Sequence, residues 1–249
     1  MKLHLSSARA LFERLPLGLA LRLAALFAVK RALAIPANLS FSQTGEDRIL
    51  SFFLHERTGF YVDVGCNDPL RYSSSFLFYL KGWRGIAIDA NDVIVDRFRR
   101  TRKRDLCVAA AVSNSERDVT FHRSESDAVS TIDEDVLEEW QDKWKFRPED
   151  QVAARTKTLT SILQEALPDQ TIDIDFMTID VEGHEFQVLS GLDFSRYRPR
   201  LITVEIHDLK TIFLNRIYLL LTGKGYSLVG YVTMNAYFLD DSAAFAPGA

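Results

Sequence analysis

The segment Phe60–Pro69 constrains the fold of this chain more than any other. Its first residues include Tyr61 and Val64, residue types that fill the interior of a sheet. The apolar run breaks at Gly65, two residues after the acid Asp63. In open α/β proteins, a hydrophobic strand that runs into a glycine turn and a helix presents backbone N–H groups to a nucleotide-like ligand. The segment therefore predicts an α/β fold with a binding site at the carboxyl edge of its sheet.

Strands and helices alternate along the rest of the chain. Apolar runs predict further strands at Arg84–Asp89, Leu106–Val112, Val119–His122, Ile172–Asp180, Leu201–Ile206, Tyr226–Val232 and Ala236–Leu239. Helical spacing predicts helices near Ser73–Lys81, Val93–Arg100, Thr158–Ala166, Gly183–Gly191 and Leu209–Thr222. This alternation is typical of a mostly parallel sheet with helices on both faces. We assign it to one domain, residues 39–249.

Residues 1–38 form a separate, helical N-terminal extension. Residues 1–35 carry a net charge of +5, whereas the whole chain carries −4. Arg22 and Lys30–Arg31 interrupt the apolar run before it reaches the roughly 20 residues of a membrane span. Two interpretations stay open. The extension packs on the domain or on a second subunit of a homodimer, or it makes a peripheral contact with an anionic membrane.

Two cysteines are too few for a disulfide framework, and no Cys/His cluster has zinc-finger spacing. This favours a cytoplasmic protein, which the second interpretation of the extension would place at the inner face of the membrane.

Residues 123–156 are irregular and strongly acidic, and they lie between the two halves of the predicted sheet. Leu137, Trp140 and Trp144 indicate a helix within them. Long segments at such positions often cover a binding site. We therefore predict a lid insertion here.

The first group of candidate site residues consists of the glycine turn and Asp89, which ends the next strand 24 residues after Gly65. A carboxylate at that place can accept hydrogen bonds from both ribose hydroxyls of an adenosine. A nicotinamide dinucleotide needs three glycines around its pyrophosphate, and this turn has one. The acids Asp63 and Asp68 would also repel a pyrophosphate. The turn therefore favours S-adenosylmethionine, although the residues alone leave open that Asp63 and Asp89 are structural.

A second constellation lies at the ends of two later strands. It contains Asp180, Glu182, His184 and Glu185 after one strand and Glu205, His207 and Asp208 after the next. These residues can face one crevice and remove a proton from a hydroxyl, for which we take His207 as base, assisted by Asp180, with His184 nearby. They can also bind Mg²⁺ or Mn²⁺ through Asp180, Glu205 and His207. We expect Glu185 to be a solvated acid at a helix start.

A basic run, Arg97–Arg104, has six basic residues in eight. We predict a solvated face at a helix C-terminus, where cations are favoured. The alternative is a contact with phosphate or anionic lipid. No nucleic-acid-binding motif accompanies the run, so we predict no nucleic-acid partner.

Four segments of the chain resemble the FkbM family of S-adenosylmethionine-dependent methyltransferases. They are Ser42–Asp47, Tyr61–Pro69 with Gly82–Ile86, Ile179–Glu185 and Arg198–Ile206. The resemblance implies a class I methyltransferase fold, which is a Rossmann-like open sheet of seven strands with an antiparallel final strand. It also implies O-methylation of a hydroxyl on a sugar, a glycan or a related natural product.

The resemblance also implies roles for individual residues. It assigns Asp63, Gly65 and Asn67 to the methionine end of S-adenosylmethionine, Asp89 to the ribose, Ser113 to the adenine, and Gln43 and Glu46 to a segment that closes over the cofactor. Many relatives have glycine where this chain has Pro69, which is acceptable in a first helical turn. Two alternatives remain: an NAD-dependent sugar oxidoreductase or epimerase, and a non-catalytic family member that binds cofactor.

Overall fold

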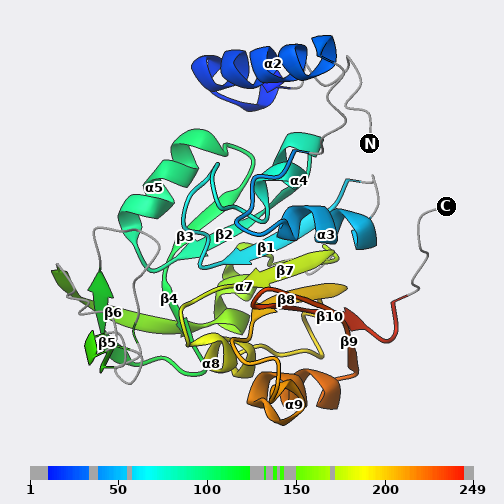
Figure 1. The fold of residues 1–249 in the computed structure, drawn as a ribbon. Helices are drawn as coiled ribbons and strands as arrows, with labels where there is room; N and C mark the ends of the chain where they lie inside the picture. The colour runs from blue at the N-terminus through cyan, green and yellow to red at the C-terminus, as the bar shows by residue number, and fades with distance from the viewer. Residues whose placement is uncertain are drawn as a thin grey trace.

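One seven-stranded sheet forms the centre of the protein (Figure 1). The computed structural model describes residues 11–33, 39–54, 58–123, 132, 137–138, 141–142, 150–168 and 172–243. The strand order is β3-β2-β1-β7-β8-β10-β9. The strands are β1 Phe60–Val64, β2 Arg84–Asp89, β3 Leu106–Ala109, β7 Phe176–Ile179, β8 Leu201–Glu205, β9 Tyr226–Val232 and β10 Asn235–Asp240. The final strand β10 is antiparallel to both neighbours, and the pairs from β3 to β8 are parallel, which confirms the predicted class.

Helices cover both faces of this sheet. They are α3 Glu46–Leu54, α4 Phe76–Lys81, α5 Asp92–Thr101, α7 Leu159–Ala166, α8 Glu185–Ser190 and α9 Arg216–Gly223, with a 3₁₀ turn η1 at Ile212–Leu214. Helix α2 Leu17–Ala32 packs on α4 and lies away from the sheet (Figure 1). The helix predicted over residues 209–222 is divided at Asn215, whose side chain caps α9 by accepting a hydrogen bond from the Ile217 N–H. Two apolar clusters pack against the sheet, one with Leu163 and Leu221 and the other with Phe78 and Trp83.

A second, smaller sheet corrects two predictions. The run Leu106–Val112 is not one strand, because it leaves the main sheet after Ala109 and continues as β4 Ala111–Ser113. There β4 pairs with β6 Asp150–Thr158, which also pairs with β5 Asp118–Arg123. Part of the segment predicted to be irregular is therefore a strand. Most of the rest of the predicted lid, including the tryptophans at 140 and 144, lies outside the described residues.

The N-terminal extension packs on the domain through one face. Leu11, Leu15, Ala20 and Leu23 join a buried cluster with Phe76, Tyr79 and Leu80 of α4. Arg14 donates a hydrogen bond of 2.6 Å to the Leu80 carbonyl. The predicted boundary at residue 38 falls outside the described residues. Within the described part of the chain, no helix combines the length and apolar character that a membrane span requires.

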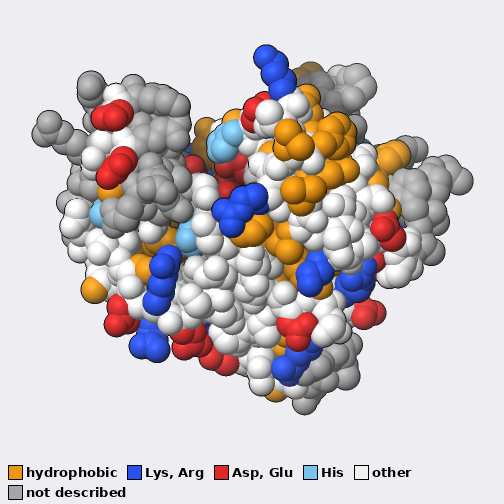
Figure 2. Space-filling view, turned by 90° about the horizontal axis from the view of Figure 1, so that it is seen from below, with side chains coloured by type: hydrophobic (Ala, Val, Ile, Leu, Met, Phe, Trp, Pro, Cys, Tyr) orange, Lys and Arg blue, Asp and Glu red, His pale blue; other side chains and the backbone are white. Residues whose placement is uncertain are grey.

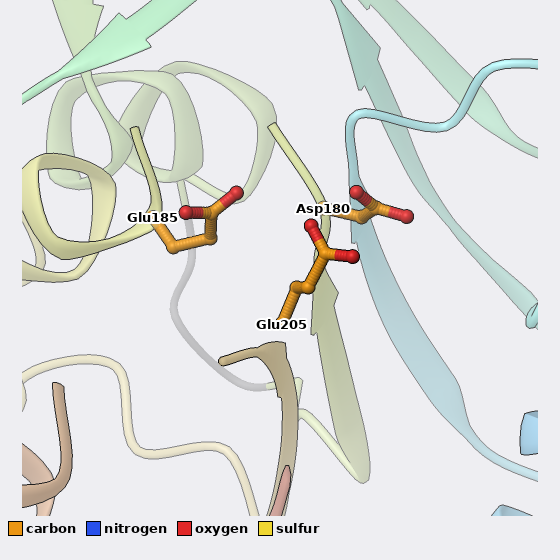
Figure 3. A group of neighbouring side chains, drawn as sticks. All are labelled: Asp180, Glu185 and Glu205. Carbon is orange, nitrogen blue, oxygen red and sulfur yellow. The ribbon is translucent and has the colours of Figure 1, made fainter. Parts of the chain in front are cut away.

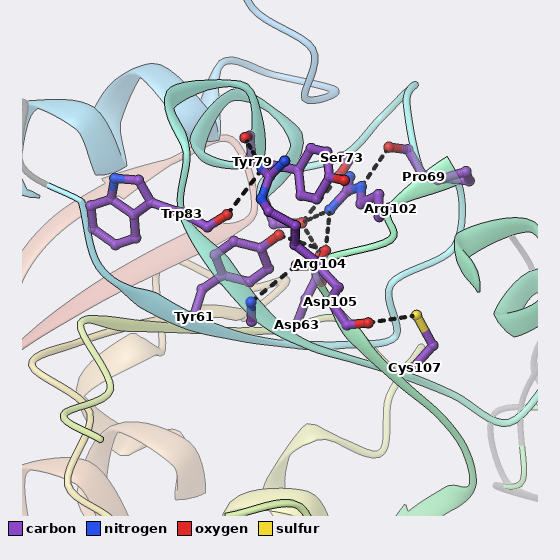
Figure 4. A network of polar contacts seen from close by, with 12 residues as sticks. Tyr61, Asp63, Pro69, Ser73, Tyr79, Trp83, Arg102, Arg104, Asp105 and Cys107 are labelled. Carbon is purple, nitrogen blue, oxygen red and sulfur yellow. Dashed lines mark hydrogen bonds and ion pairs between the residues drawn. The ribbon is translucent and has the colours of Figure 1, made fainter. Parts of the chain in front are cut away.

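The basic run contains a buried arginine, so the prediction of a fully solvated face is wrong. The Arg102 side chain is 0% exposed and donates hydrogen bonds to the Pro69 carbonyl and to Ser73 and Ser75 (Figure 4). It also lies 3.7 Å from the Asp105 carboxylate. The run crosses the end of α5, and the chain turns there so that residue 102 faces inward.

Candidate active site

The turn after β1 brings the ends of three strands together. The Gly65 N–H donates to the Ile88 carbonyl of β2, and the Asp180 N–H at the end of β7 donates to the Val64 carbonyl. Gly65 has a φ of +78°, and a Cβ added to it would lie 1.7 Å from the Asp180 carbonyl oxygen. Only glycine fits this backbone conformation and this close approach. The glycine therefore sets the distance between the first turn and the acidic turn after β7.

Replacing this glycine tests that conclusion. We expect Gly65→Ala to lower the free energy of unfolding by about 2–3 kcal/mol, because the new methyl group meets backbone and the left-handed φ is strained. Urea denaturation measures the loss. Gly223→Ala is the matched control, since its Cβ would meet nothing within 4 Å and should change stability by less than about 1 kcal/mol. Equal effects of the two substitutions would contradict the proposed contact.

Asp89 holds the same turn from the end of β2. Its two carboxylate oxygens accept hydrogen bonds from the Asn67 N–H at 3.2 Å and the Asn91 N–H at 2.8 Å. Asn67 has a φ of +50°, which suits asparagine better than most residues. The carboxylate is thereby fixed beside the turn, and its role toward a ribose stays a prediction.

A pocket of about 700 Å³, including its open mouth, lies where these strands end. Gly65, Asn67 and Asp89 line one side of it, and Asp180, Glu182 and His184 line another. Ile94, Val112, Phe121 and Ile132 supply an apolar wall. The described lining contains three acids and no lysine or arginine. Such a site favours a cationic ligand and disfavours a pyrophosphate.

The other residues predicted to bind the cofactor lie outside this lining. The buried Asp63 carboxylate accepts a hydrogen bond from Ser75 and belongs to the Arg102 network. Ser113 shares a hydrogen bond of 3.0 Å with His184 Nε2 beneath the pocket. Glu46 accepts hydrogen bonds from Thr44 and Asn235, and Gln43 is exposed. Their roles toward a cofactor stay predictions.

Three carboxylates converge next to the pocket. Single oxygens of Asp180, Glu185 and Glu205 all lie within 4.8 Å of one another (Figure 3). Seen from below, the surface has a hollow with acidic side chains in it and hydrophobic side chains beside it (Figure 2). His207 is 66% exposed, and its Nε2 lies 3.4 Å from Glu205 Oε2. Two of the three predicted cation ligands, Asp180 and Glu205, thus lie together, and Glu185 completes the group. The third, His207, lies at the exposed edge of the cluster.

Glu185 is not the solvated acid that its position at a helix start predicted. It is buried, and its Oε1 accepts hydrogen bonds from the Val181 and Gly183 N–H groups. Glu182 and Gly183 both have positive φ, which turns these N–H groups toward the Glu185 side chain. The adjacent Glu182–Gly183 pair was the sequence signal for this turn, since glycine readily adopts a positive φ.

Comparison with known proteins assigns the family. The family model described as the methyltransferase FkbM domain matches residues 63–228. The chain belongs to the FkbM methyltransferase family. The matched range includes the glycine turn, Asp89 and the acidic cluster. The predicted motif at residues 42–47 precedes it.

Among solved structures, this FkbM-family chain is similar to the methyltransferase FkbM from Methylobacillus flagellatus KT. The two share 13% sequence identity with a TM-score of 0.44, and the match covers 73% of this chain and 43% of that chain. This chain therefore aligns with less than half the length of that protein. No match was found among curated proteins.

The acidic cluster of this FkbM-family protein retains protons near neutral pH. Burial raises the pKa of Asp180 to about 7 and that of Glu205 to about 9, and repulsion by neighbouring carboxylates adds to both shifts. The pKa of Glu182 is raised to about 8 for the same reasons. Asp180 lines the open pocket and is exposed to solvent, while the neighbouring carboxylates raise its pKa. Such carboxylates can accept and release protons at the pH of a cell.

Proposed function

We propose that this chain is an S-adenosylmethionine-dependent O-methyltransferase that acts on a hydroxyl of a sugar, a glycan or a related natural product. One observation carries the proposal. A pocket whose charged lining is acidic adjoins a carboxylate cluster that can take up a proton. The first feature suits a cationic cofactor, and the second suits a hydroxyl acceptor.

The pocket residues fit S-adenosylmethionine. When bound, this cofactor supplies a methyl group carried on a positively charged sulfonium. That charge would lower the pKa of Asp180 and Glu182 and favour their ionised forms. The fixed Asp89 carboxylate can accept hydrogen bonds from ribose hydroxyls. Ile94, Val112 and Phe121 offer an apolar surface for a flat base. A nicotinamide dinucleotide fits less well, because the described lining offers its pyrophosphate no basic side chain.

The acidic cluster would activate the acceptor. A hydroxyl group attacks well only while it loses its proton, and a base with a pKa near the working pH is most effective. Asp180 meets that condition and faces the pocket, while His207 contacts Glu205 and opens onto solvent. We propose that the Asp180 carboxylate accepts the hydroxyl proton and that His207, which contacts the cluster through Glu205, assists by relaying the proton to solvent. The pocket mainly orients the two reactants, an effect that can reach effective molarities of about 10⁵–10⁸ M.

A divalent cation is the alternative occupant of the cluster. Asp180, Glu185 and Glu205 offer oxygen ligands at a suitable spacing, and a cation would replace the protons that otherwise relieve their repulsion. Activity that is lost in EDTA and restored by Mg²⁺ or Mn²⁺ would favour the cation. Activity unaffected by EDTA would favour proton transfer alone.

The function is tested by transfer of a labelled methyl group from S-adenosylmethionine into cell-envelope glycan and lipid-linked sugar fractions, with and without EDTA. We expect label in at least one fraction. Binding of NADH in calorimetry, with no binding of S-adenosylmethionine or S-adenosylhomocysteine, would overturn the proposal in favour of the oxidoreductase.

Asp89 provides a sharper test of the cofactor site. We expect Asp89→Ala to weaken S-adenosylmethionine binding about 10- to 100-fold in calorimetry, because hydrogen bonds to a charged group contribute about 1.5–3 kcal/mol. Asp96→Ala is the control, since Asp96 lies on the exposed side of α5 and pairs with Arg99. Both variants should keep a cooperative thermal transition. Equal affinities for both would remove Asp89 from the site.

A further inference from the structure

Helix α2 buries one face and leaves the opposite face without a protein partner among the described residues. Ala20 and Leu23 are buried against α4, as described above. The opposite face carries Leu17, Leu21, Leu26, Val29 and Leu33, which are between 46% and 68% exposed. Leu17, Leu21, Val29 and Leu33 are spaced by multiples of four residues, so they wind around about half of the helix, with the exposed Arg22 among them. We call these five residues the α2 surface.

The charges on helix α2 itself have one sign. Arg22, Lys30 and Arg31 lie on the same helix, and no acid occurs between Leu17 and Leu33. The chain as a whole is acidic, with a net charge of −4. Helix α2 is therefore apolar and positively charged, whereas the rest of the protein carries a net negative charge. An occupant of the α2 surface should combine an apolar interior with negative charge.

We propose that the α2 surface binds an anionic lipid bilayer, with α2 lying in the plane of the membrane interface. Apolar side chains of such a helix enter the boundary between headgroups and acyl chains, and basic residues attract anionic lipids. The buried face of α2 stays on the domain, so the helix lies along the membrane and does not enter it. A second copy of the chain is a poorer occupant, because two α2 surfaces would bring six positive charges together.

The chain offers a matched control on another side of the molecule. Phe213 and Leu214 of η1 are 64% and 78% exposed, which is comparable with the exposure of the α2 surface. They lie next to α9, at the opposite end of the molecule from α2 (Figure 1). If exposed apolar residues bound lipid without specificity, this site would bind as well.

The test is sedimentation of the full chain with vesicles of equal parts phosphatidylglycerol and phosphatidylcholine, and with vesicles of phosphatidylcholine alone. We expect binding to the first and at least about tenfold weaker binding to the second, since each basic residue near an anionic surface contributes severalfold to affinity. Leu21→Asp/Val29→Asp should abolish binding. Arg22→Gln/Lys30→Gln/Arg31→Gln should weaken it about 100-fold. Phe213→Asp/Leu214→Asp should leave it unchanged.

Circular dichroism and S-adenosylmethionine affinity check that each variant is folded, and neither readout depends on membrane binding. The proposal is overturned if the wild type does not sediment with anionic vesicles, or if the substitutions in η1 abolish binding and those in α2 do not. Light scattering, which measures the oligomeric state, tests the remaining occupant, a second copy of the chain. A dimer that Leu21→Asp/Val29→Asp converts to a monomer, without vesicle binding by the wild type, would assign the α2 surface to a second copy.

Discussion

Arg102→Ala should lower the free energy of unfolding by about 3–5 kcal/mol, the cost of removing one partner from a buried ion pair. The guanidinium is fully buried and donates to the Pro69 carbonyl and to the Ser73 and Ser75 hydroxyls. Without it, the buried Asp105 carboxylate loses its nearest cation, and these acceptors lose a donor. Denaturation in urea at fixed pH measures the loss.

Arg99→Ala is the control for this substitution. Arg99 lies three residues earlier, and its exposed pair with Asp96 should contribute less than about 1 kcal/mol. A loss of stability in Arg99→Ala as large as that in Arg102→Ala would show that helix α5, and not the buried network, determines the effect.

The pH dependence of the same loss provides a second check. Burial raises the pKa of Asp105 from 3.8 to about 6, and Arg102 acts in the opposite direction. The contribution of a raised carboxyl pKa to stability is fully present below about pH 4 and is lost as the pH rises through about 6. Removal of Arg102 raises this pKa further. Arg102→Ala should therefore be more destabilising at pH 8 than at pH 5, and equal losses at both would contradict the role of Asp105.

Asp180→Asn should lower kcat about 10²- to 10⁴-fold on a true acceptor, the usual contribution of a general base. The amide keeps the shape of the side chain and cannot accept the proton. Because the pKa of Asp180 is raised to about 7, the wild-type rate should increase as the pH rises through 7 and then level off. The variant should lack that increase. Single-turnover methyl transfer between pH 5.5 and 9 measures both effects.

Two further variants separate the members of the cluster. His207→Ala should spare cofactor affinity and lower turnover, since His207 is exposed and lies beside Glu205 at the edge of the cluster. Asp208→Asn is the control, because its exposed carboxylate accepts hydrogen bonds from Lys210 and Thr211 and does not line the pocket. Unchanged turnover in His207→Ala would show that His207 takes no part in proton transfer. Unchanged turnover in Asp180→Asn would show the same for the Asp180 carboxylate.

Most of the fold was predictable from local patterns. The bounds of β1, β2 and β9 agree with the predicted runs. For β1 and β2 the reason is that strands inside a sheet covered on both faces are buried and mostly apolar. The edge strand β9 is only partly buried, and the glycines before it mark where it begins. The prediction of a single strand over Leu106–Val112 was wrong. The segment is apolar throughout, but its first part, β3, pairs with β2, whereas its second part, β4, pairs with β6. An apolar run predicts burial but does not specify which neighbour the backbone bonds to.

The sequence by itself determined the sheet class, the glycine turn, Asp89 and the crowding of acids at two strand ends, because each depends on residues close together in the chain. Only the tertiary structure decided that Glu185 joins Asp180 and Glu205 while His207 stays at the rim. It also decided that Arg102 is buried beside Asp105. Side-chain direction and burial depend on neighbours brought from distant segments, and one-dimensional spacing does not contain that information.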